Sequence, residues 1–191
     1  MIRLAIRFAP VVLALIAAGG CTTMAMAPSY NPSVDNIQKL RDSGAGPARV
    51  GTFEAQLVSG QRDDYIQLRA SSMESPYGAR FTAYIEQALK ADLTAAQLFD
   101  EKSSLAIAGV VTRNDVSVGS FTEGTGEIEA KVTVKRDGQV RYEKVKSAKV
   151  TFESSFAGAV AIPAGRRAYP ELVQKFLATL YADADFIAAL K

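Results

Sequence analysis

The sequence predicts an α+β fold, a two-layer sandwich in which a largely antiparallel sheet of about five strands carries two amphipathic helices on one face. Three patterns lead to this prediction. Apolar residues recur at helical spacing between Phe81 and Ala96, and again between Tyr169 and Leu180. Between these stripes, residues 126–135 alternate apolar and polar side chains, as a half-buried strand does. Because such a strand leaves one sheet face wet, a parallel sheet covered on both faces is disfavoured.

The first strands and the first helix are expected in the region from residue 49 to Phe99. Residues 49–58 and 65–70 have the composition of strands and are separated by a polar turn. A helix of about five turns follows, starting at Pro76 or soon after it. Its apolar stripe comprises Phe81, Tyr84, Ile85, Ala88, Leu89, Leu93 and Ala96.

Three further strands are expected in the middle of the chain. Residues 105–118 form a long strand, and the alternating strand 126–135 comes after a loop. Asp137-Gly138 is typical of a two-residue hairpin turn of type I′, so residues 140–152 are expected to return as its partner. The apolar face of the alternating strand carries Ile128, Ala130, Val132 and Val134.

The C-terminal part is expected to contain an apolar loop and the second helix. The loop covers residues 154–165, and the helix begins near Tyr169 with Pro170 tolerated in its first turn. Asp183 and Asp185 have the spacing of a calcium-loop fragment, but the glycine and distal glutamate of such a loop are missing. These two residues are therefore expected to break or cap the helix.

Composition removes most catalytic chemistry. The 191 residues include no histidine and one cysteine, Cys21. A Ser-His-Asp or Cys-His arrangement and a histidine-containing zinc site are therefore impossible, and no other catalytic set stands out. We expect no enzyme activity, no catalytic residue, no metal and no cofactor. No disulfide is expected either, so packing must hold the fold together.

The N-terminus has the layout of a secretory signal. Arg3 and Arg7 precede the apolar run 8–18, which is too short to span a bilayer core that needs about 20 apolar residues. The end of this stretch, Ala-Gly-Gly-Cys21, resembles the bacterial lipobox, with alanine where leucine is usual. That resemblance implies removal of residues 1–20 and acylation of Cys21, with fatty acids such as palmitate as the membrane anchor. The alternative is ordinary cleavage after Ala27, which would give a soluble protein.

Charge and flanking sequence refine this address. Without Arg3 and Arg7, the 22 Lys and Arg fall to 20 and match the 20 Asp and Glu, so nothing favours nucleic acid as a partner. Thr22 follows the cysteine, and the resemblance to Gram-negative sorting signals implies the outer membrane, facing the periplasm. Residues 21–47 are rich in Pro, Ser, Gly and Asn and are expected to be the lipid anchor and a flexible tether. A single domain is expected over 48–191.

Two stretches are candidate contact sites. Residues 156–162 carry no charge, so they either tuck under the second helix or form an exposed apolar patch for a protein or lipid partner. The candidate contact residues are Phe156, Val160 and Ile162, with Tyr77 of the 75–78 loop as a weaker candidate. Arg166 and Arg167 lie where the second helix is expected to begin. Backbone N–H groups and guanidiniums there could hold an anion or a lipid headgroup.

Five runs carry a resemblance to known proteins, at residues 65–89, 106–116, 136–140, 152–163 and 182–190. They resemble a family of uncharacterised proteobacterial outer-membrane lipoproteins, and the likeness covers most of residues 60–190. The order of elements also resembles, more weakly, the lipopolysaccharide-assembly component LptE and the auxiliary lipoproteins of lipid ABC transporters.

We expect a non-enzymatic accessory or assembly subunit that binds another envelope protein. The alternative is a lipid-handling accessory of an envelope lipid or lipopolysaccharide transport system.

Overall fold

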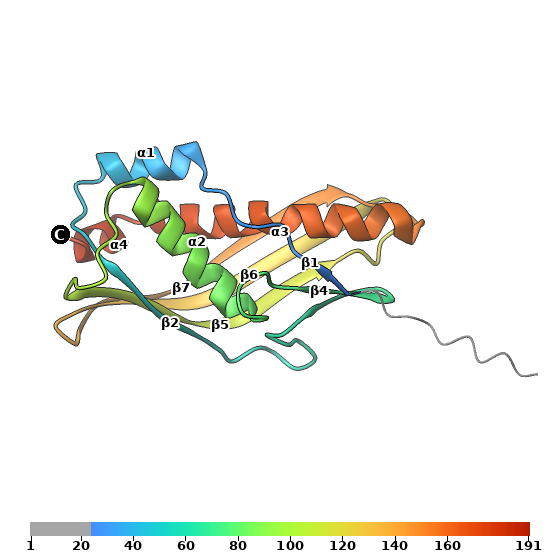
Figure 1. The fold of residues 1–191 in the computed structure, drawn as a ribbon, viewed down its shortest axis with the longest axis horizontal. Coiled ribbons are helices and arrows are strands. Elements are labelled where there is room, and N and C mark those ends of the chain that lie inside the picture. Colours follow the sequence, from blue (N-terminus) through green and yellow to red (C-terminus); the bar gives the residue numbers. More distant parts are fainter. Residues whose placement is uncertain (1–23) are drawn as a thin grey trace, which may run out of the picture.

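The computed structural model describes residues 24–191, so the expected signal peptide (1–20) and Cys21 lie outside the described residues. Two sheets and four helices make up the described part of the chain (Figure 1). In chain order the elements are β1 (Met24–Met26), α1 (Val34–Asp42), β2 (Arg49–Ala55), β3 (Ile66–Leu68), β4 (Ser71–Glu74), α2 (Phe81–Ala95), β5 (Leu105–Ser117), β6 (Glu123–Arg136), β7 (Gln139–Glu153), α3 (Gly158–Tyr181) and α4 (Ala184–Ala189).

The α+β class is confirmed, but the strands divide between two sheets. The main sheet has the order β2-β5-β6-β7, with β2 parallel to β5 and the other pairs antiparallel. The smaller sheet has the order β1-β4-β3, with β1 parallel to β4. The expectation of one sheet of about five strands missed β1 and β4. Both are too short, at three and four residues, to show a pattern of alternation.

The β6–β7 hairpin matches the sequence pattern closely. Asp137 and Gly138 have φ of 50° and 82°, the positive values that a type I′ turn requires. The four apolar side chains of the alternating strand are fully buried under the helices. On the opposite face, Glu127 forms ion pairs with Arg113 and Lys149, at 3.5 and 3.2 Å. The predicted wet face is therefore confirmed.

Helices α2 and α3 lie on the same face of the main sheet (Figure 1). They also contact each other through aromatic rings. The Tyr169 ring of α3 lies 4.9 Å from the rings of both Phe81 and Tyr84 of α2, in edge-to-face geometry. Such pairs add to the stabilisation that burial alone provides. The two predicted amphipathic helices thus form the cover of the core. The fully buried residues of α3 are Ala161, Tyr169, Leu172, Val173, Phe176, Leu177 and Leu180.

The expected loop over 154–165 is wrong in its second half, because α3 already begins at Gly158 and continues through Pro163 and Pro170. An interior proline costs a helix about 3 kcal/mol, and burial of the helix face on the sheet offsets this cost. Gly165 permits the close approach: a Cβ there would lie 2.7 Å from Cγ1 of Val118. In the sequence, the prolines predict that a helix does not continue through them, whereas the packing that stabilises this helix is visible only in the structure.

The expected flexible tether over 21–47 is wrong from residue 24 on. β1 pairs with β4, and α1 packs against α2 and α3. The side chains of Ala27, Tyr30 and Leu40 are buried in the common core. Residues 24–47 therefore belong to the folded domain, which was expected to begin only at residue 48. Because this segment is rich in Pro and Ser, its composition does not reveal that these three side chains are buried.

A buried carboxylate ties this N-terminal segment to the helices. Asp92 of α2 is completely buried and accepts hydrogen bonds from the hydroxyls of Tyr30 and Tyr181, each at 3.0 Å. The Asn36 amide of α1 lies 3.5 Å from Asp92 and also donates to the Gln174 carbonyl of α3 at 3.1 Å. Burial raises the pKa of Asp92 to about 6, although the three hydrogen bonds act in the opposite direction.

Asp92→Asn should remove a pH dependence of stability. A carboxyl whose folded pKa is raised contributes stability that is complete below its unfolded pKa, near 4, and is lost as the pH rises through 6. The free energy of unfolding of the native chain should therefore fall by about 3 kcal/mol between about pH 4 and pH 7. Urea titrations at both pH values measure this difference. The exposed Asp35→Asn variant of α1 is the control and should keep the native slope. An unchanged slope in Asp92→Asn would contradict the assignment.

Candidate functional site

The features of the described residues that could form a site are exposed side chains and hollows. Within residues 24–191, no three His, Cys, Asp or Glu side chains come together as a metal site. No helix in that range has the length and apolarity needed to cross a membrane. The search for a site therefore turns to exposed apolar side chains and to hollows between elements.

Three exposed apolar side chains, from two loops and the first turn of α3, form what we call the apolar tip. Phe121 lies in the β5–β6 loop, Phe156 in the β7–α3 loop and Val160 in α3. Their exposed fractions are 67%, 76% and 55%. The two phenyl rings contact each other with centroids 5.5 Å apart. Burying two aromatic rings is strongly favourable, so leaving both in water marks this surface as a contact site.

One arginine holds the two loops of the apolar tip together. The guanidinium of Arg69, in the β3–β4 turn, donates to the carbonyls of Val118 at 2.8 Å, Ser155 at 2.7 Å and Phe156 at 2.6 Å. A fourth, longer contact reaches the Ser120 carbonyl at 3.5 Å. Arg69 itself has a φ of 55°, an uncommon backbone conformation for a residue other than glycine. The tip is thus a fixed surface, held from outside its own loops.

The described chain begins at the same end of the molecule. Met24 pairs with Ser72, three residues after Arg69, and the side chains of Met24 and Met26 are exposed. Arg166 of α3 donates two hydrogen bonds to the Met26 carbonyl, at 3.1 and 2.5 Å. β1 and the start of α3 both lie toward the right of Figure 1. The apolar tip and the start of the described chain therefore lie toward the same end of the molecule.

The other predicted contact residues have different surroundings. Ile162 is partly buried against the core. Tyr77 packs edge-to-face on Tyr84, and its hydroxyl accepts a hydrogen bond from the Tyr30 amide at 3.1 Å. It therefore helps to hold the N-terminal segment. Of the predicted contact residues, Phe156 and Val160 lie in the apolar tip. Phe121 was missed, since a lone aromatic residue in a polar loop carries no pattern.

The predicted anion site loses its basis. Arg166 and Arg167 lie in the third turn of α3 rather than at its start, because the helix begins at Gly158. Backbone N–H groups in a third turn already bond within the helix and cannot hold an anion. Arg166 serves instead as the clamp on β1, while Arg167 is exposed.

A groove of about 650 Å³ opens between α1 and the C-terminal residues. It is lined by charged residues of α1 and the terminal Lys191, and by apolar residues that include Ile187 and Ala188 of α4. Both α1 and α4 lie toward the left of Figure 1, away from the apolar tip. Apolar and charged side chains occur together in protein-binding surfaces.

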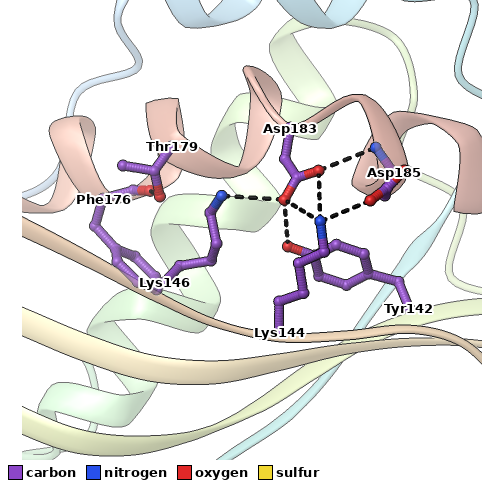
Figure 2. A network of polar contacts seen from close by, with 7 residues as sticks. All are labelled: Tyr142, Lys144, Lys146, Phe176, Thr179, Asp183 and Asp185. Atoms are coloured by element: carbon purple, nitrogen blue, oxygen red, sulfur yellow. Dashed lines mark hydrogen bonds and ion pairs between the residues drawn. The ribbon is translucent and has the colours of Figure 1, made fainter.

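A polar network fixes the α3–α4 corner beside this groove, as Figure 2 shows. Asp183, whose side chain is 10% exposed, accepts hydrogen bonds from the Tyr142 hydroxyl at 3.0 Å and the Lys146 ammonium at 3.1 Å. Lys144 bridges Asp183 and Asp185, at 3.2 and 2.7 Å. Asp183 also accepts from the Asp185 amide at 3.0 Å, so it is the N-cap of α4. The predicted helix punctuation is confirmed.

The same network sets the protonation state of Asp183. Its partial burial opposes ionisation, but the hydrogen bonds from Lys146, Lys144 and Tyr142 together outweigh burial. They hold the pKa of Asp183 well below its usual range. The carboxylate is therefore charged at every ordinary pH and binds α4 to β7.

Comparisons with known proteins support the fold. No family model and no curated protein matches the sequence. A Xanthomonas campestris protein of the DUF330 family has a TM-score of 0.57 at 11% identity, over 83% of this chain and 92% of that one. A candidate lipoprotein of Caulobacter crescentus has a TM-score of 0.44 at 11% identity, over 81% and 96%. A minor lipoprotein of Acinetobacter baumannii has a TM-score of 0.41 at 12% identity, over 70% and 89%.

At such identities, the likeness to the DUF330 protein shows a common fold and nothing further. The resemblance to uncharacterised proteobacterial lipoproteins stays a prediction. The likeness to LptE stays a prediction.

Arg69→Ala should loosen the apolar tip while the core stays folded. The carbonyls of residues 118, 155 and 156 lose their common donor, and a half-buried charged donor of this kind contributes about 1–3 kcal/mol. Hydrogen exchange should therefore accelerate in residues 118–122 and 154–157, with little change in β6. Arg167→Ala, which removes an exposed arginine of α3, is the matched control. Equal exchange in both variants would show that Arg69 does not hold the loops.

Asp183→Asn should weaken the α3–α4 corner. It keeps a capping oxygen but removes the charge that two lysines contact, which we expect to cost about 2 kcal/mol at neutral pH. The pH dependence of stability is opposite to that expected for Asp92. Because the folded pKa of Asp183 is lowered, the stability that it contributes is present above about pH 4 and is lost on further acidification. Unfolding titrations above and below about pH 4 should show that this acid-induced loss is smaller in the variant. Asp185→Asn, on a carboxylate that is 73% exposed, should have a smaller effect.

Proposed function

We propose that the protein is a non-enzymatic lipoprotein of the bacterial envelope. In this proposal, acylated Cys21 anchors it in the outer membrane and the domain faces the periplasm. There it acts as an accessory or assembly subunit, and the groove between α1 and α4 binds another envelope protein. The observation that carries the proposal is the separation of the apolar tip from the groove. The described chain begins toward the end of the molecule that carries the tip, and the groove lies toward the other end.

The short distance between anchor and domain supports this arrangement. Two residues, Thr22 and Thr23, separate Cys21 from Met24, where β1 begins, and the three residue steps between Cys21 and Met24 span at most about 10 Å. An acylated Cys21 would therefore hold the β1 end of the domain at the membrane. The groove would then face away from the lipid, toward the periplasm.

The packing of the helices bears on the alternative function. A lipid-handling role for the helix layer requires an apolar space that shields acyl chains. The apolar faces of α2 and α3 are instead occupied by the main sheet, and Leu172, Phe176 and Leu177 are completely buried there. The groove is lined by charged residues that include Asp35, Lys39 and Asp42. These features favour a protein partner over an acyl chain.

The anchor is tested by the mass of the mature protein purified from membranes. We expect an N-terminus at Cys21 carrying a diacylglyceryl group and an N-acyl chain. The Cys21→Ser variant should lose this mass and its tight membrane association, because acyl chains contribute about 0.8 kcal/mol for each buried CH₂. A free thiol, or an N-terminus after Ala27, would contradict the anchor. Separation of inner and outer membranes by density tests the predicted sorting.

The groove is tested by crosslinking in intact cells. A photoreactive residue placed at Gln38 or Ala188, which line the groove, should capture one discrete envelope protein. The matched control is the same residue at Val145, an exposed position of β7. Equal capture at both places, or co-purification of phospholipid or lipopolysaccharide without a protein, would contradict the accessory role. The second outcome would favour the lipid-handling alternative.

A further inference from the structure

We propose that the apolar tip inserts into the lipid bilayer beside the anchor, so that the domain stands on the membrane in one orientation. This inference rests on the proposed lipid anchor and goes beyond it. An anchor alone leaves the domain free to turn, whereas a second contact fixes which elements face the lipid. The contact consists of Phe121, Phe156 and Val160, with Met24 and Met26 close to the anchor.

The tip is shaped for an interface rather than for the core. Its two phenyl rings contact each other in a tilted arrangement and are still mostly exposed. Each ring belongs to a loop residue, and polar side chains are the usual choice in surface loops. Arg69 ties both loops to the β3–β4 turn through their carbonyls, so the rings stay outside the core. The exposure is therefore a property of the folded protein.

The bilayer is the occupant that the position of the tip favours. The described chain begins at Met24, paired with β4 just after the turn that carries Arg69. Thr22 and Thr23 stand between Cys21 and Met24, so an acylated Cys21 would enter lipid within about 10 Å of β1. A surface so near the anchor meets lipid before it meets a soluble partner. Aromatic and aliphatic side chains are those that peripheral proteins bury at the boundary of headgroups and acyl chains.

The start of α3 suits the headgroup layer. No side chain caps this N-terminus, and the first turn contains no acidic residue. The N–H groups of Val160 and Ala161 donate to the Ala157 carbonyl, which leaves those of Gly158 and Ala159 to donate to lipid phosphates once the tip has inserted. Phe156 precedes this turn and Val160 lies in it, so the apolar contact and the polar contact would form together.

Tryptophan reporters test the insertion, because the chain contains no tryptophan of its own. Phe156→Trp and, separately, Phe121→Trp are made in the full chain, and the acylated protein is purified from membranes. It is then reconstituted in vesicles of phosphatidylethanolamine and phosphatidylglycerol, with or without brominated acyl chains. The matched control is Val140→Trp, which has a similar exposed fraction of 55% and lies at the β6–β7 hairpin.

We expect the emission of the two tip reporters to shift to shorter wavelength in vesicles. Their quenching by brominated lipid should exceed that of the control several-fold, and quenching by aqueous iodide should fall by a similar factor. If Phe156→Trp is quenched by iodide as strongly as the control, the insertion is wrong even though the anchor is intact. A shift that follows protein concentration without lipid would reveal a second copy as the occupant and would also overturn the proposal.

The mass of the mature protein, measured on the same sample, shows whether Cys21 is acylated and so separates the two proposals. A free thiol overturns the anchor. The tip is then judged by the same fluorescence after vesicles are added, and the absence of any shift overturns it as well. Phe156→Asp supplies a second readout: it should fold as the native chain does and keep its acyl chains. In Phe156→Asp combined with Phe121→Trp, the shift of the Phe121→Trp reporter should be lost.

Discussion

The buried carboxylate of Asp92 holds the N-terminal segment of the described chain against the helices. Its hydrogen bonds from Tyr30 and Tyr181, together with the Asn36 amide, join the N-terminal segment, α1, α2 and α3 in one network. Removing such a group from water is costly, and the cost is offset only when all of these partners are in place. The network therefore binds residues 24–42 to the helices, although their composition is that of a linker. The positions of Tyr30 and α1 against the helices depend on this network.

Sequence patterns predicted those elements that carry their own periodicity. The alternation of β6 and the Asp137-Gly138 turn determine a hairpin locally, and the apolar stripe of α2 needs no partner to be recognised. The segments that were misjudged depend on contacts far away in the chain. In the first half of α3, Gly165 lies close to Val118, and α1 is held through Asp92. Local propensity is silent about both.

The candidate site was predictable in part for the same reason. A run without charges drew attention to Phe156 and Val160, although their neighbour Phe121 stands alone in a polar loop. The stacking of the two rings depends on loops that are far apart in sequence. Arg69, which holds these loops together, was unremarkable in the sequence because its role consists of hydrogen bonds to four backbone carbonyls. Backbone acceptors carry no signature in side-chain composition.

The two ends of the sandwich are specialised in opposite ways. At one end, loops expose apolar side chains next to the start of the described chain. At the other end, Asp183 and its lysines fix the short α4 against β7, and the groove beside it is lined by both apolar and charged residues. Charged side chains are costly to bury in lipid, whereas exposed apolar side chains are disfavoured in water. The polarity of each end therefore supports the proposed orientation, in which the tip would face the membrane and the groove would face the aqueous side.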